Sequence, residues 1–187
     1  GTYDKEGKPN AMNAAWGGQW DMHEIIISLG SHQTTDNLKD NDELIEVKLT
    51  DGDRDVFLVT KYGQCIRFHE SDVRCMGRTA FGVRGITLAE EDFIVGAGIY
   101  EEGKTLLSVT ENGYGKRTEL SAFLKLDENG ERTQPQSRGG KGMIAYGLTE
   151  KTGPVAGVQV VSGDEDLMAI ENNGVIIRMR MMTPLFS

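Results

Sequence analysis

The sequence predicts an all-β protein built as a propeller-like repeat of four-stranded blades, an incomplete ring of about three to three and a half blades. Two observations support this fold class. First, 24 glycines stand against only 4 prolines in 187 residues, and so many glycines are typical of tight turns between short strands. Second, a strand–turn–strand pattern recurs along the chain in a constant internal register. A recurring unit of this kind covers the apolar face of its neighbour.

The recurring unit contains a turn glycine that is followed four residues later by an arginine. The pairs are Gly63 and Arg67, Gly113 and Arg117, and Gly174 and Arg178. Glycines and arginines alike are 50 residues apart in the first interval and 61 in the second. The longer interval contains a polar insertion at residues 127–132, which we expect on a surface loop.

The repeat divides the chain into two regions. Residues 1–41 show little periodicity, and we expect a divergent N-terminal segment and partial blade with a strand at 25–29. Residues 42–187 are expected to form the repeated blades, starting near 42, 91 and 152, with the last blade truncated.

Alternating or β-branched residues predict the individual strands of each unit. The expected strands are 43–49, 56–60 and 65–68 in the first unit, 93–100, 106–110 and 114–117 in the second, and 155–161, 167–170 and 175–178 in the third. Closed rings of this kind have four to eight blades. About three units therefore leave sheet edges open, and we expect the isolated chain to self-associate.

The composition of the chain indicates its cellular compartment and argues against a disulfide framework or a zinc site. The chain is 38% hydrophobic and 26% charged, without an apolar run long enough for a bilayer or an N-terminal charged-then-apolar signal. These features predict a soluble, intracellular protein with no membrane partner. Cys65 and Cys75 do not form a disulfide framework. Together with His69 they lack the fourth ligand of a zinc site, so we expect no metal there.

The net charge of −9 disfavours DNA binding by a uniformly acidic protein. However, the charge is segregated along the chain. Residues 61–86 contain five basic against two acidic residues, whereas residues 36–55 contain eight acidic against three basic residues. If these segments lie on different faces, one face can bind a polyanion.

The heptad Gln136 to Gly142 is the strongest candidate for an anion site. It combines Arg138 and Lys141 with the three glycines Gly139, Gly140 and Gly142. Glycines let the backbone approach a phosphate while two cations reach it. A degenerate copy spans residues 78–85, and aligning the two copies predicts the same position in successive blades.

Cations repeated at one position of successive blades would trace an arc, along which duplex DNA can be bound and bent without base reading. The expected DNA-binding residues are Arg138, Lys141, Gln136, Gly139, Gly140, Gly142, Arg78, Arg84, Arg74, Lys116, Arg117 and Arg178.

Four segments resemble the C-terminal domain family of bacterial DNA gyrase A. They are residues 71–86, 110–118, 136–142 and 148–154, and the heptad is similar to the family's glutamine-arginine-glycine box. The resemblance implies a β-pinwheel that wraps DNA around a basic perimeter and so supports ATP-dependent negative supercoiling by the whole type IIA topoisomerase. Two departures stand out. The box follows at least one complete blade, and Ser137 replaces the basic residue common at its second position.

The resemblance also implies what lies outside this chain. The DNA-cleaving tyrosine belongs to another part of gyrase A, so this fragment alone is expected to have no catalytic residue and no cofactor, and ATP and Mg are implied for the whole enzyme only. The implied partners are double-stranded DNA, the remainder of gyrase A, and gyrase B in an A2B2 enzyme. The implied location is the cytoplasm, in association with the nucleoid.

Two rival functions remain at this stage. One is the homologous C-terminal domain of topoisomerase IV, which also binds DNA but lacks the box. The other is a propeller-type protein-interaction module, which the acidic net charge would suit. A calcium loop is disfavoured, because Val56 follows Asp51, Asp53 and Asp55 where such a loop needs glycine.

Overall fold

The computed structural model describes residues 47–74, 82–170 and 175–180 in full. Of the N-terminal part it describes four strands as backbone: β1 (Thr2–Tyr3), β2 (Pro9–Asn10), β3 (Trp16–Asp21) and β4 (Glu24–Ser28). β1 pairs with β2, and β3 pairs with β4, both antiparallel. The strand predicted at 25–29 is therefore confirmed as β4.

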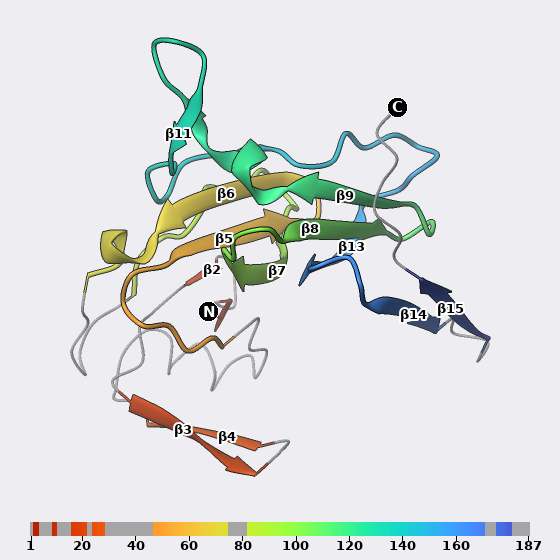
Figure 1. The fold of residues 1–187 in the computed structure, drawn as a ribbon, viewed down its shortest axis with the longest axis horizontal. Coiled ribbons are helices and arrows are strands. Elements are labelled where there is room, and N and C mark those ends of the chain that lie inside the picture. The colour runs from red at the N-terminus through yellow and green to blue at the C-terminus, as the bar shows by residue number, and fades with distance from the viewer. Residues whose placement is uncertain are drawn as a thin grey trace.

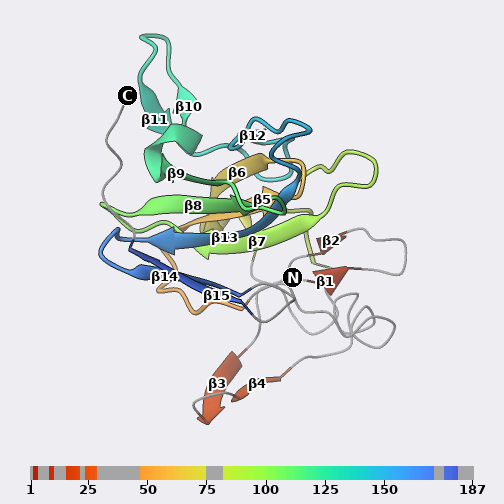
Figure 2. The same cartoon turned by 90° about the vertical axis from the view of Figure 1, so that its right-hand side faces the viewer.

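The rest of the described chain is also built of strands, joined by turns and two short 3-10 helices (Figures 1 and 2). The strands are β5 (Asp55–Thr60), β6 (Gln64–His69), β7 (Ile94–Ile99), β8 (Thr105–Thr110), β9 (Gly115–Glu119), β10 (Lys125–Leu126), β11 (Arg132–Gln134), β12 (Met143–Ile144), β13 (Val155–Val161), β14 (Asp166–Ile170) and β15 (Ile176–Arg180). The 3-10 helices are η1 (Glu70–Asp72) and η2 (Leu120–Phe123). The described residues contain no α-helix, which confirms the all-β prediction. Within them, no helix is long and apolar enough to cross a membrane.

The three predicted hairpins are present as β5–β6, β8–β9 and β14–β15. The first has the sheet order β12-β6-β5-β7, and the second has the order β13-β8-β9. Hence β7 and β13, which follow their hairpins in sequence, each add a strand to the sheet of the preceding hairpin. The sheets formed by the described strands are open and do not close into a ring.

The strand predicted at 43–49 is wrong where the structure describes it. Residues 47–50 adopt no regular structure, and Leu49 is 95% exposed. The segment is held by a side chain rather than by a neighbouring strand. The carboxylate of Glu70 accepts hydrogen bonds from the Thr50 hydroxyl and from the Arg54 N–H at 2.7 Å.

The first sheet is buried on both faces, which explains why β5 is continuously apolar from Val56 to Val59. Phe57, Val59 and Cys65 pack on one face against Leu106, Leu120 and Phe123 of the second unit. Ile66 and Phe68 pack on the opposite face against Ile86 and Ile94. Each fully buried side chain of this size contributes about 1.5–3 kcal/mol. This core fixes the platform on which the heptad lies.

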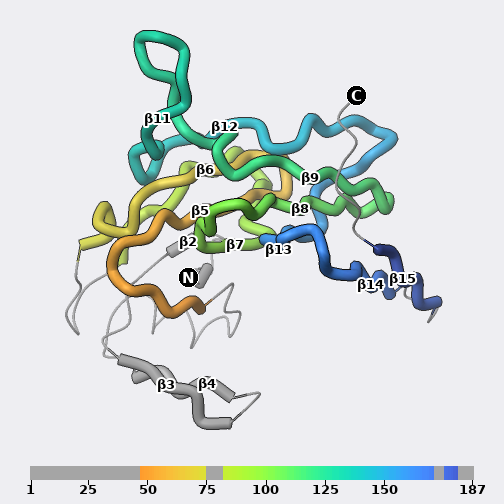
Figure 3. Tube along the Cα trace, viewed as in Figure 1, coloured from red at the N-terminus to blue at the C-terminus, as the bar shows by residue number. Residues whose placement is uncertain are grey.

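The segment from Gln136 to Tyr146 runs along the outer edge of β6 (Figure 3). β12 pairs with the start of β6, so that Met143 lies opposite Cys65. The Ala145 N–H continues the pairing by donating to the Gly63 carbonyl at 2.8 Å. The heptad therefore leads into an added edge strand and is not a free loop.

Candidate nucleic-acid interface

The two ends of the heptad are fixed by hydrogen bonds and by close packing. The Gln136 N–H donates to the Arg67 carbonyl at 2.7 Å, and its Nε2 donates to the Phe123 carbonyl at 3.1 Å. At the other end, Gly142 has φ +78°, and a Cβ there would lie 2.7 Å from the Cys65 carbonyl oxygen. Only glycine fits so close to β6 in this backbone conformation. Gln136 and Gly142 thus position the residues between them.

The two glycine-rich basic stretches lie directly against each other. The Gly139 N–H donates to the Gly85 carbonyl at 2.8 Å, and the Thr87 N–H donates to the Gly140 carbonyl at 2.8 Å. The Thr87 hydroxyl also donates to the Gly139 carbonyl at 2.7 Å. Segments more than 50 residues apart in sequence are therefore joined by backbone pairing.

Arg138 links this pair of stretches to a third segment. Its Nε donates to the Asp72 carbonyl at 2.9 Å, and its Nη1 donates to the Arg84 carbonyl at 2.6 Å. We call the resulting group of cations the basic edge. It consists of Arg74, Arg84, Arg138 and Lys141.

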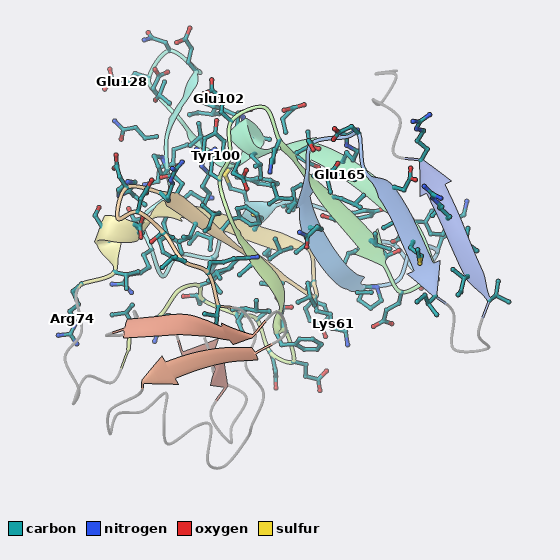
Figure 4. All side chains as sticks on the ribbon, turned by 60° about the horizontal axis from the view of Figure 1, so that its bottom comes forward. Lys61, Arg74, Tyr100, Glu102, Glu128 and Glu165 are labelled. Carbon is teal, nitrogen blue, oxygen red and sulfur yellow. The ribbon has the colours of Figure 1, made fainter. Side chains whose placement is uncertain are left out.

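The charges of the basic edge are not cancelled within the described residues. Arg74, Arg84 and Lys141 are exposed, and in that part of the chain their side chains form no ion pair (Arg74 is labelled in Figure 4). Arg138 is half-buried and bonds to neutral carbonyls, which leave its full charge available. An array of unpaired cations on an ordered backbone suits phosphate groups.

Arg78 lies outside the described residues, and so does Cys75. The predicted equivalence of Arg78 with Arg138 therefore stays a prediction. One feature of the aligned copies is visible, because Gly82 and Gly142 have the same left-handed backbone, with φ values of +74° and +78°.

Arg117 and Arg178 lie elsewhere and have partners in their own hairpins. The repeated arginine reaches the residue twelve positions earlier in all three units. Arg67 donates to Asp55, Arg117 to the Thr105 hydroxyl and Arg178 to Asp166, each through Nε, at 2.8, 3.0 and 2.7 Å. The arginine that recurs four residues after each turn glycine thus forms a hydrogen bond across its hairpin.

Arg67 shows the most buried form of this contact. Only 5% of the residue is exposed, its Nη1 donates to the Leu120 carbonyl at 2.9 Å, and its guanidinium lies 3.8 Å from the centre of the Tyr100 ring. Lys116, by contrast, is exposed on β9 opposite Ser108. It remains a separate candidate contact.

The residues considered for metal binding take other roles where they are described. Cys65 is a buried free cysteine, and burial raises the pKa of its thiol, so it stays protonated. The three aspartates at 51, 53 and 55 do not converge. Asp51 bonds to Arg54, Asp53 lies 3.2 Å from His69 Nε2, and Asp55 pairs with Arg67.

One cation near the heptad is not predicted by any sequence pattern. Lys125 belongs to β10, just before the polar insertion at residues 127–132, and its Nζ donates to Ser137 Oγ at 3.1 Å. A lone lysine before a polar insertion carries no local signal. Only the folded arrangement brings it to the heptad.

One family model matches the part of the chain that contains strands β5 to β13 and the basic edge. The family model described as DNA gyrase C-terminal domain, beta-propeller, matches residues 54–100, 104–130 and 134–162. These matched segments cover more than half of the chain and include both basic stretches.

Individual proteins give the same result. The chain is 44% identical over 145 residues to the DNA gyrase A protein of Staphylococcus epidermidis and 43% identical to that of Staphylococcus aureus. Each match covers 76% of this chain but only 15% of the relative, so the chain spans a small part of their length.

Two solved structures share the fold. A structure of the DNA gyrase A C-terminal domain matches with a TM-score of 0.56 at 28% identity, covering 82% of this chain and 51% of the other. A crystal structure of the C-terminal domain of DNA topoisomerase IV matches with a TM-score of 0.62 at 25% identity, covering 73% of this chain and 40% of the other.

Proposed function

The chain belongs to the DNA gyrase C-terminal domain family, and from this premise we propose that its basic edge binds the phosphate backbone of duplex DNA and bends it. One observation carries the proposal. Arg138 bridges the carbonyls of Asp72 and Arg84, and this contact gathers four cations from three separate segments on a chain of net charge −9.

Backbone recognition follows from the chemistry of these groups. Lysine and arginine side chains that contact phosphates release condensed counterions, so affinity falls steeply with salt. Phosphate contacts position the duplex and carry no sequence information directly. The expected binding is therefore strong at low salt and similar on different sequences.

Bending is the part of the proposal that requires several contacts at once. Curving a site of 20–30 base pairs by 40–90° costs of order 1–6 kcal/mol. Contacts from Arg138, Lys141 and Arg84, together with Arg74, can offset that cost. Arg78, Lys116, Arg117 and Arg178 remain further candidates along the path.

At the level of the whole enzyme, we propose that this domain wraps DNA for ATP-dependent negative supercoiling. The partners would be the remainder of gyrase A, together with gyrase B in an A2B2 assembly, in the bacterial cytoplasm on the nucleoid. The catalytic tyrosine, ATP and Mg would belong to those other parts, and this domain would bind and shape DNA without cutting it.

A salt titration of DNA binding tests the proposal. Fluorescence anisotropy with a labelled duplex of about 40 base pairs should give a plot of log affinity against log salt with a slope of about −0.9 for each phosphate contact. The double variant Arg138→Glu, Lys141→Glu should weaken binding equally on duplexes of unrelated sequence. A wild-type slope near zero, or a loss confined to one sequence, would contradict backbone binding.

The topoisomerase IV alternative is favoured by one observation, the TM-score of 0.62 to that domain. It shares the DNA-binding chemistry, so the salt titration does not separate the two. A supercoiling assay separates them, with an enzyme in which this domain replaces the native C-terminal domain. Gain of negative supercoils supports the gyrase role, and relaxation alone supports the other.

The protein-interaction alternative is favoured by exposed apolar side chains on β14 and β15, which include Met168, Ile170 and Ile176. Such a patch is typical of a contact surface. Under this alternative, the salt slope of DNA binding would be absent.

A further inference from the structure

The hairpin β10–β11 projects from the sheets beside the heptad (Figures 1 and 2). Lys125 lies opposite Gln134, and Leu126 lies opposite Arg132. The turn is closed by Asp127, whose carboxylate accepts from the N–H groups of residues 129 and 131 at 2.9 and 2.8 Å. These bonds make the insertion an ordered hairpin with a defined base.

Two contacts attach the base of this hairpin to the heptad. Phe123, just before β10, is buried in the core, and its carbonyl accepts from Gln136 Nε2 at 3.1 Å. Two residues later, Lys125 Nζ donates to Ser137 Oγ at 3.1 Å. The contact between Gln136 and Phe123 is anchored in the core. The fold therefore fixes the position of Lys125 next to Ser137.

This contact leaves donors available for an anion. A lysine ammonium has three N–H donors, and only one is directed to Ser137 Oγ. Since Ser137 accepts through its oxygen, its own O–H can still donate. Both groups are exposed, and the next residue is Arg138, whose guanidinium is fixed by the Asp72 and Arg84 carbonyls.

We propose that Lys125 and Ser137 form one composite phosphate-binding position on duplex DNA, in which Lys125 supplies from β10 the positive charge that the heptad lacks at its second residue. This inference rests on the proposed function and extends the basic edge by one segment. The hairpin also has a negative end, because Glu128 and Glu131 follow at its turn (Glu128 is labelled in Figure 4). Like-charge repulsion there would limit how far the duplex extends along the hairpin.

A matched pair of lysine variants tests the inference. Lys125→Gln should raise the Kd for a duplex of about 40 base pairs about 3–10-fold near 50 mM salt and reduce the salt slope by about one contact. The control is Lys104→Gln, which removes the same charge from a lysine that pairs with Glu101 and has Glu165 and Asp164 nearby. It should change the Kd by less than about twofold, because that surface already repels phosphate.

Relocating the charge gives a second, independent readout. Adding Ser137→Arg to Lys125→Gln should restore the wild-type Kd and slope, because it returns a cation to the same position. Thermal melting by circular dichroism checks that all variants fold. If wild type shows a normal slope and Lys125→Gln binds as tightly as Lys104→Gln, the composite position is wrong while the proposed function stands. A wild-type slope near zero overturns both.

Discussion

Single residues decide how closely the heptad can approach the sheet. Gly142 combines a left-handed backbone with a near contact to the Cys65 carbonyl, whereas Gly130 has φ +82° but nothing within 4 Å of a Cβ position. A substitution at Gly130 would therefore cost backbone strain alone, whereas a substitution at Gly142 would add a steric clash.

We expect Gly142→Ala to lower the free energy of unfolding clearly more than Gly130→Ala. Each variant forces a side chain into the left-handed region, at about 1–2 kcal/mol, but only the first drives a methyl group into β6. Urea denaturation of both variants measures the difference. Equal losses would show that β12 can shift away from β6 without cost.

Glu165 predicts a pH effect on stability. Its carboxylate accepts from the Ser162 hydroxyl, the Ser162 N–H and the Gly163 N–H, and these hydrogen bonds lower the pKa of Glu165 from 4.5 to about 2. Since the folded-state pKa is depressed, the stabilisation is complete above pH 4.5 and is lost as the pH falls toward 2.

Glu165→Gln should therefore melt at a lower temperature than wild type at neutral pH, and the difference should vanish as the pH approaches about 2. Thermal melting across this pH range measures it, with Glu150→Gln as an exposed control. If the difference in melting temperature stays constant with pH, the ionised carboxylate of Glu165 is not the source of the stabilisation.

At the scale of elements, the repeated arginine holds each hairpin across its two strands. The three partners differ, since Asp55 and Asp166 are charged while Thr105 is neutral. The contact is also buried to different degrees. The side chains of Arg67 and Asp55 are 6% and 11% exposed, whereas that of Arg178 is 74% exposed.

Arg67→Met should be the most destabilising of the arginine substitutions. It leaves the Asp55 carboxylate largely buried without its cation, and breaking such a pair costs about 3–5 kcal/mol. Chemical denaturation gives the loss, and Arg178→Met, with an exposed arginine, should cost much less. If the two variants lose the same stability, the burial of the first pair is not what makes it strong.

The hairpins also show how far local sequence can predict this fold. Turn glycines and alternating residues give the positions of β5, β6, β8 and β9, because a turn and its two strands are close in sequence. The pairing of β7 with β5 and of β13 with β8 was not visible in the same pattern. Such pairing depends on backbone hydrogen bonds between segments that no local motif connects.

For the whole molecule, the third hairpin differs from the first in burial. Met168, Ile170 and Ile176 are 60%, 68% and 61% exposed. The repeat register aligns them with Phe57, Val59 and Cys65, which are at most 1% exposed because the second unit covers them. In the described part of the chain, β14 pairs only with β15, whereas β5 and β8 each have strands on both sides.

We therefore expect the isolated chain to self-associate through this apolar, open-edged hairpin. Sedimentation velocity and light scattering over a hundredfold range of concentration should show a rising average mass. Ile170→Lys should reduce it, because a charge on the patch disfavours burial. Leu126→Lys, at a separate exposed leucine on β10, should leave it unchanged. A mass independent of concentration would contradict the prediction.

The sequence by itself determined the all-β class and the recurring hairpins, since strand alternation and turn glycines act over a few residues. The heptad as the leading anion site stays a prediction. The tertiary structure alone decided that the Arg84 and Arg138 stretches meet, and that Lys125 lies beside Ser137. It also showed that each repeated arginine forms a hydrogen bond to the other strand of its own hairpin. The physical reason is that these contacts join residues distant in sequence, and their geometry is set by the packing of the core between the sheets.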